Sequence, residues 1–209
     1  MKVLILSDVH GNLPALELVL KTNRDVDLIV SLGDIVNYGP WSNECVELLD
    51  TLDNVVLLSG NHEKAYLHGY YDGVNPIAKA FFEYCYPSFT KHNLISNYLE
   101  EYYINQTKFT HTIDGKYIYP DSEINLINDI FIGHSHRLFL KYSNGYRLVN
   151  VGSVGQNRLN INDINFVIWD SKSNCLNLCT NRNDSNIILN EMKNRKYPEI
   201  CMNYLITKL

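Results

Sequence analysis

The stretch MKVLILSDVHGN, residues 1–12, decides the fold class because polar residues directly follow a short apolar run. The run from Val3 to Leu6 has the length of a buried strand and is far shorter than the roughly 20 apolar residues of a membrane span. Asp8 follows soon after, and no small-residue cleavage site is present, so we interpret this segment as a first strand and not as a signal peptide. No other window approaches the length of a span, and we expect a cytoplasmic protein without a membrane partner.

Short apolar runs recur along the chain with helical stretches between them, which is typical of an α/β protein. Apolar residues at helical spacing predict a helix over residues 13–22, where Pro14 is a favoured entry residue, and a second helix around residues 45–52. Buried strands are predicted at residues 3–6, 28–32, 55–58 and 130–132, and antiparallel strands at residues 165–169 and 175–180.

The 209 residues predict one domain, because a chain of this length builds a single ordinary core. Neither an internal repeat nor a convincing linker divides it. Residues 66–103 are rich in aromatic side chains at helical spacing, so we predict a helical insertion there and interpret its aromatics as packing residues. Residues 187–209 predict two short helices separated at Pro198.

The charge and cysteine content argue against further classes of protein. Lys plus Arg is 18 and Asp plus Glu is 23, which gives a net charge of −5. Neutralising nucleic-acid phosphates requires surplus cations, and no Lys/Arg cluster adjoins the motifs described below, so a nucleic-acid partner is not expected. The five cysteines are scattered and form no Cys-x-x-Cys pair, so we interpret them as reduced thiols and expect neither a zinc knuckle nor a thioredoxin-like motif.

Each of four predicted strands is followed at once by residue types that bind metals. In open α/β sheets, ligands gather at the carboxyl ends of the strands, so these residues are expected to meet at one edge. One such motif alone is usually a turn or a surface pair, and the prediction depends on the four occurring together. Oxygen and imidazole donors without sulfur suit manganese, iron or zinc, and their number fits a two-metal site. The four motifs are Asp8-Val9-His10, Gly33-Asp34, Gly60-Asn61-His62-Glu63 and Gly133-His134-Ser135-His136.

With these motifs, the sequence resembles the calcineurin-like metallophosphoesterase superfamily. Three further segments resemble its small bacterial and archaeal branch: residues 7–16 (SDVHGNLPAL), residues 38–40 (YGP) and residues 152–158 (GSVGQNR). The resemblance covers most of residues 1 to 170. It implies a four-layer α/β/β/α sandwich of two mixed β-sheets, with the site at their edge.

The resemblance also implies roles for individual residues. Asp34 would bridge the two ions, and His62 would donate a proton to the leaving oxygen or contact the phosphate. His111 is the one ligand outside the four motifs, because it stands alone in Thr110-His111-Thr112, where the branch usually has Gly after the histidine. One ion would be held by Asp8, His10, Asp34 and His136, and the other by Asp34, Asn61, His111 and His134.

The function expected from the resemblance is a dinuclear metal-dependent phosphoesterase that acts on a small, nucleotide-like phosphate mono- or diester by metal-hydroxide attack. The expected cofactors are two divalent ions, manganese first, with iron or zinc as alternatives. Arg158 or Arg137 would add a cation for a second phosphate, unless they are solvated surface residues. The alternatives are a dinucleoside polyphosphate hydrolase, a metal-dependent nuclease and a non-catalytic interaction scaffold of the same fold; a homo-oligomer is compatible with the sequence. The complete set of ligands and proton donor favours the enzyme.

Overall fold

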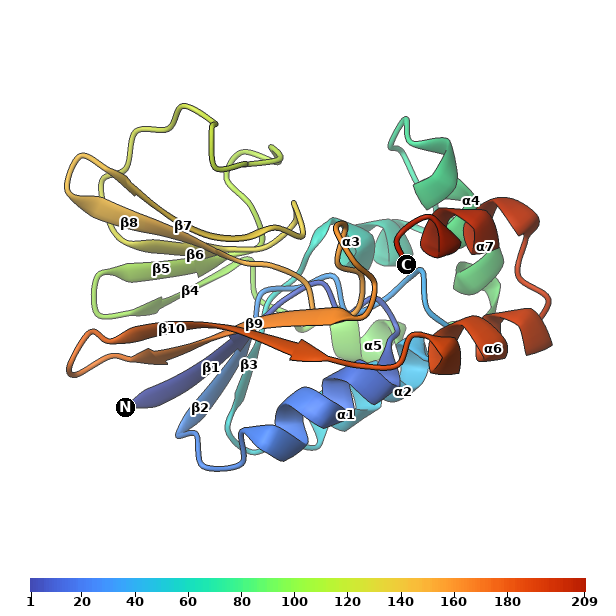
Figure 1. The fold of residues 1–209 in the computed structure, drawn as a ribbon, viewed down its shortest axis with the longest axis horizontal. Coiled ribbons are helices and arrows are strands. Elements are labelled where there is room, and N and C mark those ends of the chain that lie inside the picture. Colours follow the sequence, from blue (N-terminus) through green and yellow to red (C-terminus); the bar gives the residue numbers. More distant parts are fainter.

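The computed structural model describes residues 1–209 as two five-stranded sheets that lie face to face (Figure 1). The first sheet has the order β10 (Leu176–Arg182), β9 (Asp163–Asp170), β1 (Lys2–Leu6), β2 (Leu28–Ser31) and β3 (Val55–Leu57). The second has the order β4 (Glu101–Ile104), β5 (Thr107–Thr110), β6 (Ile130–Ile132), β8 (Tyr146–Val151) and β7 (Leu138–Ser143).

Both sheets are mixed, which confirms the prediction of an α/β fold built on two mixed β-sheets. In the first, β1, β2 and β3 are parallel, and β9 and β10 run antiparallel to their neighbours. In the second, β5, β6 and β8 are parallel, and β4 and β7 are antiparallel edges. The parallel strands of each sheet therefore end at a common edge, where the loops that follow them can meet.

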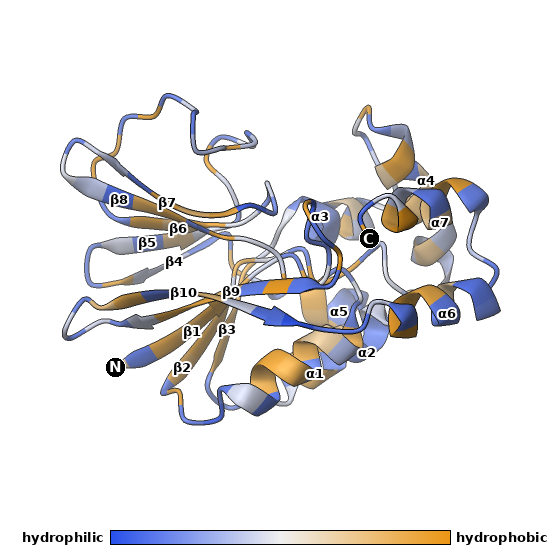
Figure 2. Ribbon diagram, viewed as in Figure 1, coloured by the Kyte–Doolittle hydropathy of each residue, from blue (hydrophilic) through white to orange (hydrophobic).

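The alternation of side chains along β1 explains how the sheet is covered on both faces. Val3 and Ile5 pack into the core between the two sheets, whereas Leu4 and Leu6 pack into a second core under the helices. α1 (Leu13–Thr22) and α2 (Ser42–Asp50) lie along the outer side of this sheet (Figure 1). Figure 2 shows hydrophobic residues along the inner strands and on α1, as these two cores require.

The remaining helices gather at one end of the sandwich (Figure 1). They are α3 (Asn61–His68), α4 (Pro76–Cys85), η1 (Tyr86–Ser88), α5 (His92–Ile95), α6 (Asn186–Asn194) and α7 (Glu199–Ile206). Pro198, where the sequence predicts a break, immediately precedes α7. Residues 101–103, at the end of the predicted helical insertion, are the first residues of β4.

The outer face of the second sheet is covered by the segment between β5 and β6, which contains no helix. Ile118 and Leu126 of this segment are buried against Ile130, Ile132 and Phe139 of the sheet. The outermost layer on this side is thus irregular chain in place of the helices that the resemblance implies. None of the helices combines the length and the apolar character needed to cross a bilayer.

The cysteines form no disulfide. The strand predicted over residues 175–180 would place Cys175 and Cys179, an even number of residues apart, on one packed side, and this is wrong for Cys175. That residue precedes β10, in the turn after β9, and is exposed, whereas Cys179 is half-buried in the strand.

Candidate active site

The predicted site residues meet at one place in the fold, where the loops after the parallel strands converge. Asp8 and His10 follow β1, and Asp34 follows β2. Asn61 and His62 begin α3 after β3, His111 follows β5, and His134 and His136 follow β6. All of them are buried except Asn61, which is half-buried. The structure therefore brings together residues from both sheets that are up to 128 positions apart in the sequence (136 − 8).

The first cluster is formed by Asp8, His10 and His136. Nε2 of His136 lies 3.1 Å from Asp8 Oδ1 and 3.2 Å from His10 Nε2. His10 Nε2 is also 3.7 Å from Asp8 Oδ1. The three donor atoms thus surround one small space.

The second cluster is formed by Asp34, His111 and His134, with Asn61 beside it. His111 Nε2 lies 3.2 Å from Asp34 Oδ2, 3.1 Å from His134 Nδ1 and 3.2 Å from Asn61 Oδ1. The same Asp34 oxygen is 4.0 Å from His10 Nε2 in the first cluster. Asp34 is therefore placed between the two groups.

The ring orientation of three histidines is set by backbone carbonyls. Nδ1–H of His10 donates to Val36 O at 3.1 Å, that of His111 to Leu32 O at 3.0 Å, and that of His136 to Gln156 O at 2.6 Å. In a neutral ring this leaves the proton on Nδ1 and the lone pair on Nε2. Each Nε2 lone pair is thus aimed into the clusters, which is the usual arrangement of metal-binding histidines.

In the first cluster the Nε2 lone pairs of the histidines and the Asp8 carboxylate face one another without a proton between them. Asp8 Oδ1 is buried and accepts no hydrogen bond, although His136 Nε2 is only 3.1 Å away. Buried acceptors held this close repel each other unless a cation lies among them. Asp, Asn and imidazole donors in two groups joined by Asp34 fit two divalent metal ions.

The electrostatics of the clusters keep most of the candidate ligands in the protonation state that binds a metal. Burial opposes the ionisation of Asp8 and Asp34, yet the neighbouring histidines hold the pKa of each carboxyl well below its usual range. Burial lowers the pKa of His134 to about 4, and this ring is neutral at pH 7. His111 differs, because the Asp34 carboxylate outweighs burial and raises its pKa to about 9.

The backbone of the site is strained, which identifies it as a place under functional constraint. Five of the candidate ligands have positive φ, a conformation that non-glycine residues rarely adopt: Asp8 (54°), His10 (48°), Asp34 (55°), His134 (67°) and His136 (55°). The glycines of the motifs provide the necessary space. A Cβ on Gly60 would lie 2.1 Å from Asp34 Oδ1, and one on Gly133 would lie 2.5 Å from Asp8 Oδ2.

Two residues of the site were given no role by the sequence. Glu63 is fully buried, and its carboxylate accepts the N–H groups of Asp34 and Ile35 at 2.7 Å and that of Gly60 at 2.8 Å. It thereby ties the loop after β2 to the start of α3. The position of Glu63 three residues after Gly60, at a helix start, is a signal that could have revealed this capping role.

Asn37 is the second of these residues, and it orients His62. Its Nδ2 donates to His62 Nδ1 at 3.0 Å, and its Oδ1 accepts from the Tyr66 hydroxyl at 3.4 Å. The proton of the His62 ring is therefore on Nε2, which lies 4.0 Å from Asp34 Oδ2. Burial lowers the pKa of His62 to about 3, so the free ring is neutral at pH 7 and presents an N–H to the site.

The two candidate phosphate-binding arginines differ in position. Arg158 lines a cavity of about 510 Å³ beside the clusters, whereas Arg137 is half-buried and lines none of the main cavities. Of the other two histidines, His68 is exposed beside Tyr70, and His92 packs against Tyr86 and Phe89.

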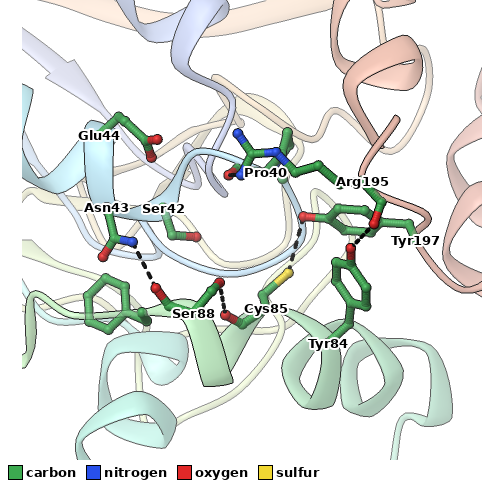
Figure 3. A pocket seen from close by; sticks show the side chains of 11 residues that line it. Pro40, Ser42, Asn43, Glu44, Tyr84, Cys85, Ser88, Arg195 and Tyr197 are labelled. Carbon is green, nitrogen blue, oxygen red and sulfur yellow. Dashed lines mark hydrogen bonds between the residues drawn. The ribbon is translucent and has the colours of Figure 1, made fainter. Parts of the chain in front are cut away.

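A separate cavity of about 490 Å³ is lined by Pro40 in the loop after β2 and by residues of α2, α4 and the segment after α6 (Figure 3). Arg195 donates there to Pro40 O, Asn43 donates to Ser88 O, and the thiol of Cys85 contacts the Tyr197 hydroxyl. Burial raises the pKa of this thiol to about 12, so it is not a nucleophile at neutral pH. None of the residues predicted for the site lines this cavity.

Known proteins share both the sequence pattern and the fold. An uncharacterized protein of Methanocaldococcus jannaschii is 31% identical over 205 residues, with 81% of this chain and 83% of that protein covered. A metallophosphoesterase structure from Sphaerobacter thermophilus has a TM-score of 0.81 at 25% identity and covers 100% of this chain and 99% of its own. A hypothetical protein from Pyrococcus horikoshii has the same fold, with a TM-score of 0.83 at 16% identity over 98% of this chain and 97% of that one. The sequence model of calcineurin-like phosphoesterases matches residues 1–171, so the chain belongs to this family and is a hydrolase of phosphate esters.

Proposed function

We propose that the protein is a dinuclear metal-dependent phosphoesterase that hydrolyses a small, nucleotide-like phosphate mono- or diester. The observation that carries this proposal is the pair of acceptor clusters that share Asp34, whose Oδ2 lies 3.2 Å from His111 Nε2 and 4.0 Å from His10 Nε2. One carboxylate between two groups of imidazole and oxygen donors is the arrangement that a two-metal site requires. Manganese is the first candidate, since no sulfur is present among the donors.

Asp8, His10 and His136 would hold one ion, Asn61, His111 and His134 the other, and Asp34 both. When bound, the two ions neutralise the charge that develops on the phosphoryl oxygens and lower the pKa of a coordinated water. The protein keeps the donors fixed through the carbonyls of Val36, Leu32 and Gln156. Little reorganisation is then needed when the substrate binds.

His62 would donate a proton to the leaving group. In hydrolysis the oxygen of water forms a bond to phosphorus, the ester P–O bond breaks, and the alcohol departs with a proton. The His62 ring presents Nε2–H toward Asp34, within the space where the phosphate would lie. A phosphate anion next to the ring would raise the low pKa of His62, because an opposite charge favours the protonated form, and the ring could then supply that proton.

The complete donor set also supports the enzyme over a non-catalytic scaffold, which has no need of converging ligands. The five free thiols support a reducing compartment such as the cytoplasm. The proposal is tested by dialysing the protein against a chelator, reloading it with manganese, iron or zinc, and assaying 4-nitrophenyl phosphate and bis(4-nitrophenyl) phosphate. We expect activity that is lost on chelation and restored with two ions per chain. Absence of turnover with every metal, or activity that survives complete chelation, would contradict the proposal.

A further inference from the structure

A cavity lined by tyrosines adjoins the candidate active site and has a size suited to a small ligand. Its volume is about 510 Å³, and ligand pockets commonly measure about 300–1,000 Å³. Its aromatic and charged lining residues are four tyrosines and one arginine: Tyr38, Tyr71, Tyr117, Tyr204 and Arg158. We call this the tyrosine pocket.

Three walls of the tyrosine pocket pack directly against histidines of the site. The Tyr117 ring stacks on His134, with centroids 4.0 Å apart and an interplanar angle of 19°. The centroid of the Tyr38 ring lies 4.6 Å from that of His10 and 5.2 Å from that of His62. Tyr71 stacks on the His62 ring at 6.2 Å. A molecule with its phosphate at the clusters would therefore extend into this pocket.

The pocket is assembled from segments that are distant in sequence. Tyr38 follows β2, Tyr117 lies in the irregular segment between β5 and β6, and Tyr71 lies between α3 and α4. Tyr204 comes from α7, beyond the residues that the family model matches. The centroid of its ring lies 6.5 Å from that of Tyr38 and 6.3 Å from that of Phe81. Tyr71, Tyr117 and Tyr204 thus lie outside the segments shared with the family branch, whereas Tyr38 and Arg158 belong to them.

Arg158 provides the charge of the pocket. Its guanidinium lies 5.2 Å from the centre of the Tyr117 ring, and its buried Nε has no hydrogen-bond partner. The arginines that form ion pairs in this structure are Arg147, Arg182 and Arg195, so the charge of Arg158 is not balanced by a carboxylate. A half-buried cation without a counterion favours binding of an anion, and the planar guanidinium suits a phosphate.

Resting on the proposed function, we infer that the tyrosine pocket selects nucleotides that carry a second phosphate. The base would stack on the tyrosine rings, and the non-scissile phosphate would pair with Arg158. Stacking on aromatic side chains is tolerant of base identity, so the class is defined by a planar base and not by one particular base.

Three probes separate the contribution of the base from that of the second phosphate: ribose 5-phosphate, adenosine 5′-monophosphate and adenosine 3′,5′-bisphosphate. The first two differ only in the base, and the last two only in the second phosphate. Their inhibition constants are measured against hydrolysis of 4-nitrophenyl phosphate by manganese-loaded protein. We expect binding to tighten about tenfold at each step, as base stacking and a charge-assisted phosphate contact predict.

Substitutions in the pocket test which residue provides the gain in affinity from the base and which provides the gain from the second phosphate. Tyr204→Ala should weaken the monophosphate about tenfold and leave ribose 5-phosphate unchanged, while Tyr204→Phe should retain the preference for the base. Arg158→Gln should remove the gain from the second phosphate, and Arg158→Lys should retain part of it. Tyr146→Ala, at an exposed tyrosine on β8 outside the pocket, is the matched control and should change nothing.

Equal binding of ribose 5-phosphate and the monophosphate by the wild type would overturn the inference, as would Tyr204→Ala weakening all probes alike. The failure of the proposed function is distinguishable, because the metal-loaded protein would then not hydrolyse 4-nitrophenyl phosphate at all. In that case the dissociation constants of the same three probes are measured by calorimetry. The same order of affinities, from ribose 5-phosphate to the monophosphate to the bisphosphate, would support the role of the pocket.

Discussion

His111 Nε2 lies 3.2 Å from Oδ2 of Asp34, while the other ring nitrogen of His111 is bound to the carbonyl of Leu32. This contact joins the edges of the two sheets, because His111 follows β5 in one and Asp34 follows β2 in the other. It also explains why the pKa of His111 is raised to about 9 in spite of burial, since the adjacent carboxylate favours the imidazolium. A divalent ion at this position has to replace that proton.

Binding of manganese at pH 7 should therefore release about one proton from His111, and the affinity should rise with pH up to about 9. In the metal-free protein the pKa lies above the ordinary value of 6.5. The Asp34–His111 pair thus stabilises the fold fully below pH 6.5, and this contribution is lost as the pH rises through about 9. Calorimetric titrations in buffers of different ionisation enthalpy count the protons. A proton count that is the same in wild type and His111→Gln would contradict this assignment.

His62→Ala should slow the hydrolysis of alkyl or nucleoside esters by about 10²–10⁴-fold, the usual value of general acid catalysis, with a much smaller effect on nitrophenyl esters. The reason is that a nitrophenolate departs readily without a proton, whereas an alkoxide does not. Both metal ions should remain bound. Equal slowing of the two substrate types would show that His62 positions the phosphate instead of donating a proton.

Asn37→Ala should reproduce part of the His62 effect without removing the ring. The substitution deletes the 3.0 Å hydrogen bond that keeps the proton on Nε2, so the ring becomes free to adopt the other tautomer. We expect a loss of about tenfold in kcat for alkyl esters, of the size that one misplaced hydrogen bond causes. Asn37→Ala added to His62→Ala should cause no further loss, and an additive loss would mean that Asn37 acts by another route.

Glu63→Ala should destabilise the protein by about 3 kcal/mol or more, because it leaves several buried N–H groups without an acceptor. Thermal unfolding of the metal-free protein measures the loss. Glu100→Ala is the matched control, since that carboxylate is exposed and pairs only with Lys64 on the surface, a contact worth at most about 1 kcal/mol. If the two variants were equally stable, the buried carboxylate would not be what holds the loop after β2 to α3.

Local pattern was sufficient to predict much of the fold. The helix predicted over residues 13–22 and the strand over 130–132 have those bounds in the structure, because each is a strongly patterned segment with clear breakers beside it. The segment between β5 and β6 could not be predicted in this way. Its buried residues, Ile118 and Leu126, do not belong to an apolar pattern with helical or strand spacing. They are held by contacts with a sheet that is distant in sequence.

The candidate site shows the same division. The motif residues could be located because each directly follows a strand, whereas the roles of Asn37 and Glu63 depend on hydrogen bonds between separate loops. The helical spacing of the aromatic residues in 66–103 predicts that they are packing residues, and this holds for Phe81 and Phe82, which are buried. It is incomplete for Tyr71, which lines the tyrosine pocket together with Tyr204 from the other end of the chain.

The central claim is that Asp34 joins two metal sites, and metal content per chain tests it most directly. Wild type, Asp34→Asn and His136→Ala are loaded with manganese, dialysed and measured by mass spectrometry of the metal. The wild type should retain two ions, His136→Ala should mainly weaken one, and Asp34→Asn should lose both, because the Asp34 carboxylate lies near donor atoms of both clusters. An Asp34→Asn protein that still holds two tightly bound ions would contradict the account.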